Sequence, residues 1–194
     1  MLARYDGVGW DTWEVGMYAH SVALDSNGGA WVNGHFTRQP ELLASIDARG
    51  VVQHELPAHP TMAGTPGGPI PYELRNGPDG TIWMSELQGN RVIAYTPSTG
   101  ASRVFTMPTP VSGPRRLDVD KDGIVWIPGY ASGTLIRLDP SKPAGQQFEE
   151  LALPIPASAP YIARVHPRTG TVWIGTGTAD AVFAYHPDAK RFDT

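Results

Sequence analysis

The sequence predicts an all-β fold, a β-propeller built from four-stranded blades, and three observations lead to this prediction. In four segments a glycine stands three residues before a tryptophan: Gly28 and Trp31, Gly80 and Trp83, Gly123 and Trp126, Gly170 and Trp173. A proline follows each of the last three tryptophans at fourteen residues: Pro97, Pro140 and Pro187. Glycine (22) and proline (19) are frequent, and no segment keeps the i, i+3, i+4 apolar spacing of a helix. Fixed offsets within strand-rich units of roughly 40 to 50 residues are typical of a propeller.

The best-matched unit covers residues 71–97 and reads PYELRNGPDGTIWMSELQGNRVIAYTP. Two apolar-alternating runs flank Asp79-Gly80, a pair that favours the tight turn of a β-hairpin because glycine tolerates its backbone angles. A third run follows the Gln88-Gly89-Asn90 turn. The unit therefore reads as successive antiparallel strands.

The remaining units follow in order within one domain. We expect a partial blade at residues 1–18, blades at 19–57, 71–108 and 114–154, and an incomplete blade at 160–194. Residues 2–6 match the third strand of the second unit, and the chain stops where the last unit should begin its fourth strand. We therefore expect about four blades of a six- or seven-bladed propeller. Open strand edges invite pairing, so self-association through them is also expected.

Composition and charge exclude several classes of partner. The net charge of −4 and pI near 5.8 argue against a nucleic-acid surface. No apolar run approaches the length of a membrane span, and the start MLARYDGVGW lacks the apolar core of a secretory signal. There is no cysteine. We expect a soluble, bacterial-type protein, either cytoplasmic or exported with its signal missing.

The repeated pattern P-[YH]-x-[IL]…DG-x-[IV]-W-x-x-E…GN-[RK]-[IV] resembles the virginiamycin B lyase (streptogramin lyase) family over all four units, most closely in residues 71–97. The resemblance implies a seven-bladed propeller and an enzyme that opens a cyclic depsipeptide by elimination at its ester, with a magnesium ion. Position by position, His20 matches the family's strand-start histidine, and Tyr72 and Tyr161 match its strand-start tyrosine. Glu86 matches a glutamate three residues after tryptophan, and His35 takes the place of the catalytic acid.

In a propeller these residues should lie on one face. First strands line the central channel, so their starts and the ends of the second strands gather on one face. We expect the catalytic residues His20, His35 and Glu86 there, which could also hold a divalent metal such as Mg²⁺. The expected ligand contacts on the same face are Tyr72, Glu73, Arg115, Tyr130 and Tyr161.

Arg115 and Arg116 are consecutive in a predicted strand, so at most one should face the channel and hold a carboxylate or phosphate.

Two functions stay open at this point. One is a metal-assisted lyase or lactonase acting on an ester or lactone. The other is a non-catalytic binding or sensor module that takes a small molecule or peptide on the central face. The connection at residues 57–71 is either a solvated link or a lid over that face.

Overall fold

The computed structural model describes residues 1–36, 40–62, 64–65 and 68–194, and all its regular elements are strands. Two short strands, β1 (Leu2–Tyr5) and β2 (Trp10–Trp13), pair as an antiparallel ribbon. Four four-stranded antiparallel sheets follow in chain order. This confirms the prediction of an all-β propeller fold. Within the described residues, no helix has the length and apolarity that a membrane crossing requires.

Each sheet is an up-and-down meander. The first contains β3 (Ala19–Leu24), β4 (Ala30–Gly34), β5 (Leu42–Asp47) and β6 (Gly50–Glu55); the second, β7 (Pro71–Asn76), β8 (Ile82–Glu86), β9 (Arg91–Thr96) and β10 (Ala101–Thr106). The third contains β11 (Asp118–Val119), β12 (Val125–Gly129), β13 (Thr134–Leu138) and β14 (Phe148–Ala152); the fourth, β15 (Pro160–Val165), β16 (Val172–Thr176), β17 (Val182–His186) and β18 (Arg191–Asp193). We call these sheets blades one to four.

The turn between the first two strands of every blade requires its glycine. Gly28, Gly80, Gly123 and Gly170 all have φ between 70° and 82°, the left-handed region that other residues rarely adopt. The repeated glycine of the sequence is therefore the residue that closes each hairpin.

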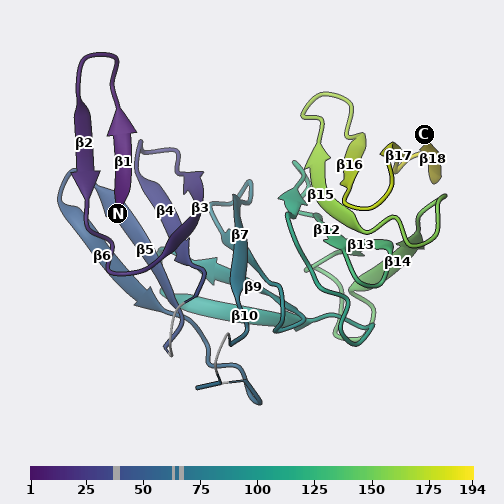
Figure 1. Cartoon of the computed structure of the whole chain (residues 1–194), viewed down its shortest axis with the longest axis horizontal. Helices are drawn as coiled ribbons and strands as arrows, with labels where there is room; N and C mark the ends of the chain where they lie inside the picture. The colour runs from purple at the N-terminus through teal and green to yellow at the C-terminus, as the bar shows by residue number, and fades with distance from the viewer. Residues whose placement is uncertain (37–39, 63, 66–67) are drawn as a thin grey trace.

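The blades follow one another along an arc, with the β1–β2 ribbon at one end and β15–β18 at the other (Figure 1). First strands of neighbouring blades contact each other in order: β3 with β7, β7 with β11, and β11 with β15. The first strands therefore lie together on the inner side of the arc, which is what the propeller prediction requires.

The blade tryptophans fill the spaces between blades. Trp31 packs on Tyr95 of the second blade and Trp126 on Tyr185 of the fourth, each with ring centroids 5.7 Å apart. Trp83 lies in a cluster formed mainly with the third blade. These three side chains are buried, whereas Trp173 in the last blade is 49% exposed. Each of the three buried tryptophans thus packs against the following blade.

Two strands differ from expectation. The last blade, expected to lack its fourth strand, has the short β18. Its Phe192 ring packs against the Tyr185 ring with 4.7 Å between ring centroids. In the third blade the regular first strand begins only at Asp118, because the residues before it make isolated bridges at Pro114 and Arg116. This irregular stretch carries two of the candidate site residues.

Candidate functional site

Four of the five predicted ligand-contact residues, with Arg116, come together at the starts of three neighbouring first strands. Tyr72 (β7) and Tyr161 (β15) hydrogen-bond through their hydroxyls, and their rings meet edge to face at 6.4 Å. Tyr130, just after β12, meets Tyr161 in the same way at 6.1 Å. Arg115 and Arg116 precede β11. We call these five residues the tyrosine–arginine cluster.

Arg115 lies inside the aromatic part of the cluster. Its guanidinium carbon is 3.9 Å from the ring centroid of Tyr130, 4.9 Å from that of Tyr161 and 5.5 Å from that of Tyr72. Cation–π attraction acts within about 6 Å of a ring. The Nη1 group also donates a long 3.4 Å hydrogen bond to the Tyr72 hydroxyl. The three rings therefore hold this cation in place.

Arg116 reaches the same tyrosines, so the expectation that the two arginines face opposite ways is wrong. Its guanidinium carbon is 5.9 Å from the Tyr72 ring and 5.8 Å from the Tyr161 ring. The reason is local: the Leu117 amide bonds back to the Arg115 carbonyl at 3.0 Å, a tight turn that a regular strand does not contain. The alternation of side chains applies only to regular strands, so both cations join the cluster.

The pKa values of the Tyr72 and Tyr161 hydroxyls are shifted in opposite directions. Hydrogen bonding from Tyr72, and then the nearby Arg116 and Arg115 guanidinium groups, lower the pKa of Tyr161. Burial, followed by the same hydrogen bond, raises the pKa of Tyr72. The surroundings therefore favour ionisation of Tyr161 over that of Tyr72.

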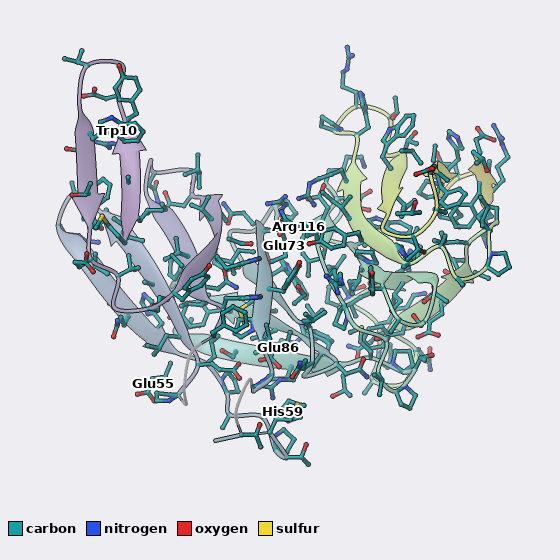
Figure 2. All side chains as sticks on the ribbon, viewed as in Figure 1. Trp10, Glu55, His59, Glu73, Glu86 and Arg116 are labelled. Carbon is teal, nitrogen blue, oxygen red and sulfur yellow. The ribbon has the colours of Figure 1, made fainter. Side chains whose placement is uncertain are left out.

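Glu73, the fifth predicted ligand contact, is engaged by the protein itself. Its carboxylate is 2% exposed and pairs through Oε1 with Arg75 at 2.8 Å and with Arg164 at 2.9 Å. Its Oε2 accepts from the Ser21 hydroxyl at 3.3 Å and lies 3.9 Å from Arg116. Figure 2 shows Glu73 and Arg116 together on the inner side of the arc. Glu73 thus anchors the arginines.

The charge of this region is opposite to that of the whole chain. Arg75, Arg116 and Arg164 pair with Glu73, and Arg75 also lies 3.5 Å from Asp118, while Arg115 contacts only the tyrosines among the described residues of the cluster. Four cations against two anions leave a surplus of two positive charges in a protein of net charge −4. The Nε atoms of Arg115 and Arg116 are buried and find no hydrogen-bond partner among the described residues. The described residues of the region therefore supply more donors than acceptors.

Sequence reasoning missed Arg75 and Arg164. Both stand three residues after a strand-start tyrosine, in PYELR at 71–75 and PYIAR at 160–164. The repeated P-Y-x-x-R motif could have identified them as a pair at equivalent positions on the central strands.

His20 and His35 lie together, but as a stack. Their rings are 4.1 Å apart and 13° from parallel. The Nδ1 of His20 donates to the Tyr72 carbonyl at 2.7 Å and the Nδ1 of His35 to the Pro71 carbonyl at 3.0 Å, which assigns the remaining lone pairs to Nε2. Burial, and secondarily the charge of His20, lower the pKa of His35. Because a metal lies in the plane of each imidazole ligand, two parallel rings this far apart do not converge on one ion.

Glu86, expected as the third metal ligand, does not join the histidines. It ends β8 opposite Arg91 on β9, and its buried Oε1 accepts from Arg91 Nη2 at 2.9 Å. Arg91 Nη2 also donates to the Pro57 carbonyl at 2.7 Å. Among the described residues, no group of three His, Cys, Asp or Glu side chains could hold a metal ion. The set His20, His35 and Glu86 does not fit a divalent ion in this structure.

The connection at residues 57–71 begins beside this ion pair. His59 Nε2 donates to the Gly89 carbonyl at 3.0 Å. Figure 2 places His59 near Glu86 and away from Glu73 and Arg116. The described start of the connection thus lies away from the tyrosine–arginine cluster, while positions 63, 66 and 67 fall outside the described residues.

Comparison with known proteins gives the fold a context. No family model matches the sequence, and no curated protein matches it. Among solved structures, the chain is similar to a streptogramin B lyase (17% identity, TM-score 0.79, covering 95% of this chain and 57% of that one). It is also similar to virginiamycin B lyase from Staphylococcus aureus (21% identity, TM-score 0.74, 90% and 54%) and to the Dos1 propeller (15%, 0.69, 91% and 48%).

The chain spans little more than half the length of either lyase. At these identities the likeness concerns the arrangement of strands, and it agrees with the arc of blades and the central first strands described above. The chain has a β-propeller fold of the streptogramin lyase type.

Proposed function

We propose that this streptogramin lyase-like propeller binds a carboxylate-bearing small molecule or peptide on its central face. The observation that carries the proposal is the cationic surplus at the tyrosine–arginine cluster. Arg115 and Arg116 face the same two tyrosines, and among the described residues Arg116 has one long carboxylate contact and Arg115 has none. Arg116 lies 3.9 Å from Glu73 Oε2, which also accepts from the Ser21 hydroxyl, while Glu73 Oε1 already pairs with Arg75 and Arg164.

Charge and shape favour an organic acid. Arginine presents a planar fork of donors that matches a carboxylate in a two-pronged contact. The Arg116 side chain is 36% exposed, so its terminal donors are accessible. Tyr130 and Tyr161 supply flat apolar walls beside the cations, which suit an organic acid better than a bare inorganic anion. A bound carboxylate would offset part of the mutual repulsion of the arginines.

The alternative of a metal-assisted lyase or lactonase at His20, His35 and Glu86 has less support. The histidines are stacked and Glu86 is paired with Arg91. Divalent-ion binding stays a prediction from the family resemblance, and the binding proposal needs no metal.

The test is calorimetry with a panel of ligands that differ only in charge. We expect 3-phenylpropanoate and related aryl carboxylates to bind, and their methyl esters and inorganic phosphate to bind far more weakly. Arg115→Gln should weaken carboxylate binding about tenfold to a hundredfold, the value of a charge-assisted hydrogen bond of roughly 1.5–3 kcal/mol. The exposed Arg49, which pairs with Asp47 away from the tyrosine–arginine cluster, provides the matched control Arg49→Gln, which should bind normally. Equal affinity for acid and ester, or an unchanged Arg115→Gln, would contradict the proposal.

A further inference from the structure

We infer that the ligand of the central face is a dicarboxylate, with one carboxylate held by Arg115 and the other by Arg116. The inference rests on the proposed carboxylate binding and narrows its ligand class. The class is a small organic acid in which a short linker joins two carboxylates and an apolar group lies beside one of them.

Arg115 holds the carboxylate that has the apolar group beside it. Its guanidinium carbon lies 3.9 Å from the ring centroid of Tyr130, 4.9 Å from that of Tyr161 and 5.5 Å from that of Tyr72. Among the described residues this cation has no carboxylate partner. A carboxylate bound here is flanked by aromatic rings, so the apolar part of the ligand packs against them.

Arg116 is the most weakly held of the three arginines around Glu73. Glu73 is 2% exposed, and its Oε1 pairs with Arg75 at 2.8 Å and with Arg164 at 2.9 Å. Arg116 lies 3.9 Å from Oε2, which also accepts from the Ser21 hydroxyl. Glu73 therefore stays compensated when Arg116 turns toward a ligand. The Arg116 side chain is 36% exposed, so a ligand can reach it.

The charges of this region balance only when two anionic groups are added. The four arginines and two carboxylates leave two positive charges in excess. Burial, and then the charge of Arg75, lower the pKa of Arg164, so the cations repel one another here. Partial burial strengthens such repulsion because it lowers the effective dielectric constant. A monocarboxylate offsets one of the two charges, and a dicarboxylate offsets both.

The two arginines are close enough to hold one small molecule. Both guanidinium carbons face the Tyr161 ring, Arg115 at 4.9 Å and Arg116 at 5.8 Å from its centroid. They also share the Tyr72 ring, at 5.5 Å and 5.9 Å. A two-carbon linker, as in a succinate, separates two carboxylates enough for each to meet its own arginine in a two-pronged contact.

The test compares ligands that differ by a single negative charge. Benzylsuccinate is 3-phenylpropanoate with a second carboxylate on a methylene arm, and its two monomethyl esters have nearly its size and one charge fewer. Calorimetry at about pH 8, where both carboxyl groups are ionised, should show benzylsuccinate binding about tenfold or more tighter than either ester. That gain is the value of one charge-assisted contact. Two interchangeable carboxylates alone account for a factor of about two.

A substitution assigns the second carboxylate to its arginine. In Arg116→Gln the ratio of the diacid affinity to the ester affinity should fall to about two, because the second carboxylate loses its partner. Arg49→Gln, away from the cluster, is the matched control and should keep the full ratio. The comparison of ligands in the unaltered protein needs no variant, so it tests the dicarboxylate even if Arg116→Gln does not fold.

The outcomes separate the inference from the proposed function. Equal affinity for benzylsuccinate and its esters, with 3-phenylpropanoate still bound, overturns the inference and leaves the binding function intact. A full ratio in Arg116→Gln also overturns it. Benzyl phosphate carries its two charges on one group, and tighter binding of benzyl phosphate than of benzylsuccinate overturns the two-carboxylate arrangement. Failure of every carboxylate to bind overturns both the inference and the proposed function.

Discussion

Glu86 was expected to be catalytic, but its buried pair with Arg91 indicates a structural role, and the substitution Glu86→Gln tests which role it has. Glu86 is 0% exposed and Arg91 4% exposed as side chains, and their charges compensate each other. The amide is nearly the same size as the carboxylate, so the variant leaves Arg91 buried and uncompensated without opening a cavity. Breaking one side of such a pair typically costs about 3–5 kcal/mol of folding free energy.

That loss is large against the roughly 5–15 kcal/mol by which domains are stable. It should lower the urea midpoint of unfolding by about 1–2 M, given usual denaturant slopes. Arg91 would keep its bond to the Pro57 carbonyl, so we expect loss of stability rather than rearrangement of the connection.

The matched control removes both charges. Glu86→Leu combined with Arg91→Met should recover most of the stability, because a buried pair replaced by apolar residues is often neutral. Carboxylate binding per folded molecule should be unchanged in all three proteins. A destabilisation under about 1 kcal/mol, or lost binding in a stable Glu86→Gln protein, would refute the structural role.

Three further predictions concern other parts of the chain. Trp173 is 49% exposed, whereas its three equivalents are buried, and Tyr5 on the ribbon matches the position of Tyr95, on which Trp31 packs. We therefore propose head-to-tail association, in which Trp173 of one copy packs on Tyr5 of the next. Sedimentation should record a mass that rises with concentration, and Trp173→Ser should abolish this rise. Burial lowers the pKa of His54 below the ordinary 6.5, so as the pH falls the unfolded chain takes up the proton before the folded chain does. The free energy of unfolding should therefore decrease below about pH 6.5. Urea titrations should show a smaller decrease in His54→Gln. Calorimetry with Mg²⁺, Mn²⁺ and Zn²⁺ tests the divalent-ion binding that the family resemblance implies: a heat that His35→Ala removes would restore the predicted ligand set, and its absence would agree with the stacked histidines.

The fold could be predicted because its determinants repeat. A positive-φ glycine closes each first hairpin and a tryptophan joins each blade to the next, so both recur at fixed offsets. The short β18 was missed because three residues carry too little alternation to identify a strand.

The sequence could predict which residues lie in the site, but not which of them contact one another. We expected Arg115 and Arg116 to face opposite ways because side chains alternate along a regular strand. The turn between Arg115 and Leu117 breaks that alternation, so both face the same tyrosines. The partner of Glu86 was visible in principle, since a four-residue hairpin loop sets it opposite Arg91. The stacking of His20 on His35 depends on two carbonyls in another blade, at Pro71 and Tyr72, and no local pattern records that contact.

The local charge of the cluster predicts an unusual response to salt. A surplus of two positive charges lies on the central face of a chain whose net charge is −4. At low ionic strength, where the Debye length is about 30 Å at 0.01 M, an approaching anion meets the repulsive field of the whole chain. At about 0.1 M the length falls to roughly 10 Å, so the distant charges are screened while the contacts with Arg115 and Arg116 act at close range.

Salt should therefore speed the association of 3-phenylpropanoate, or leave its rate unchanged, while dissociation accelerates modestly. Stopped-flow fluorescence over this range measures both rates. A basic patch on a basic protein behaves in the opposite way, because its distant charges attract the ligand. An association rate that falls steeply with salt would mean that the positive charges of the cluster attract the ligand at long range more strongly than the net negative charge of the chain repels it, and would refute this prediction.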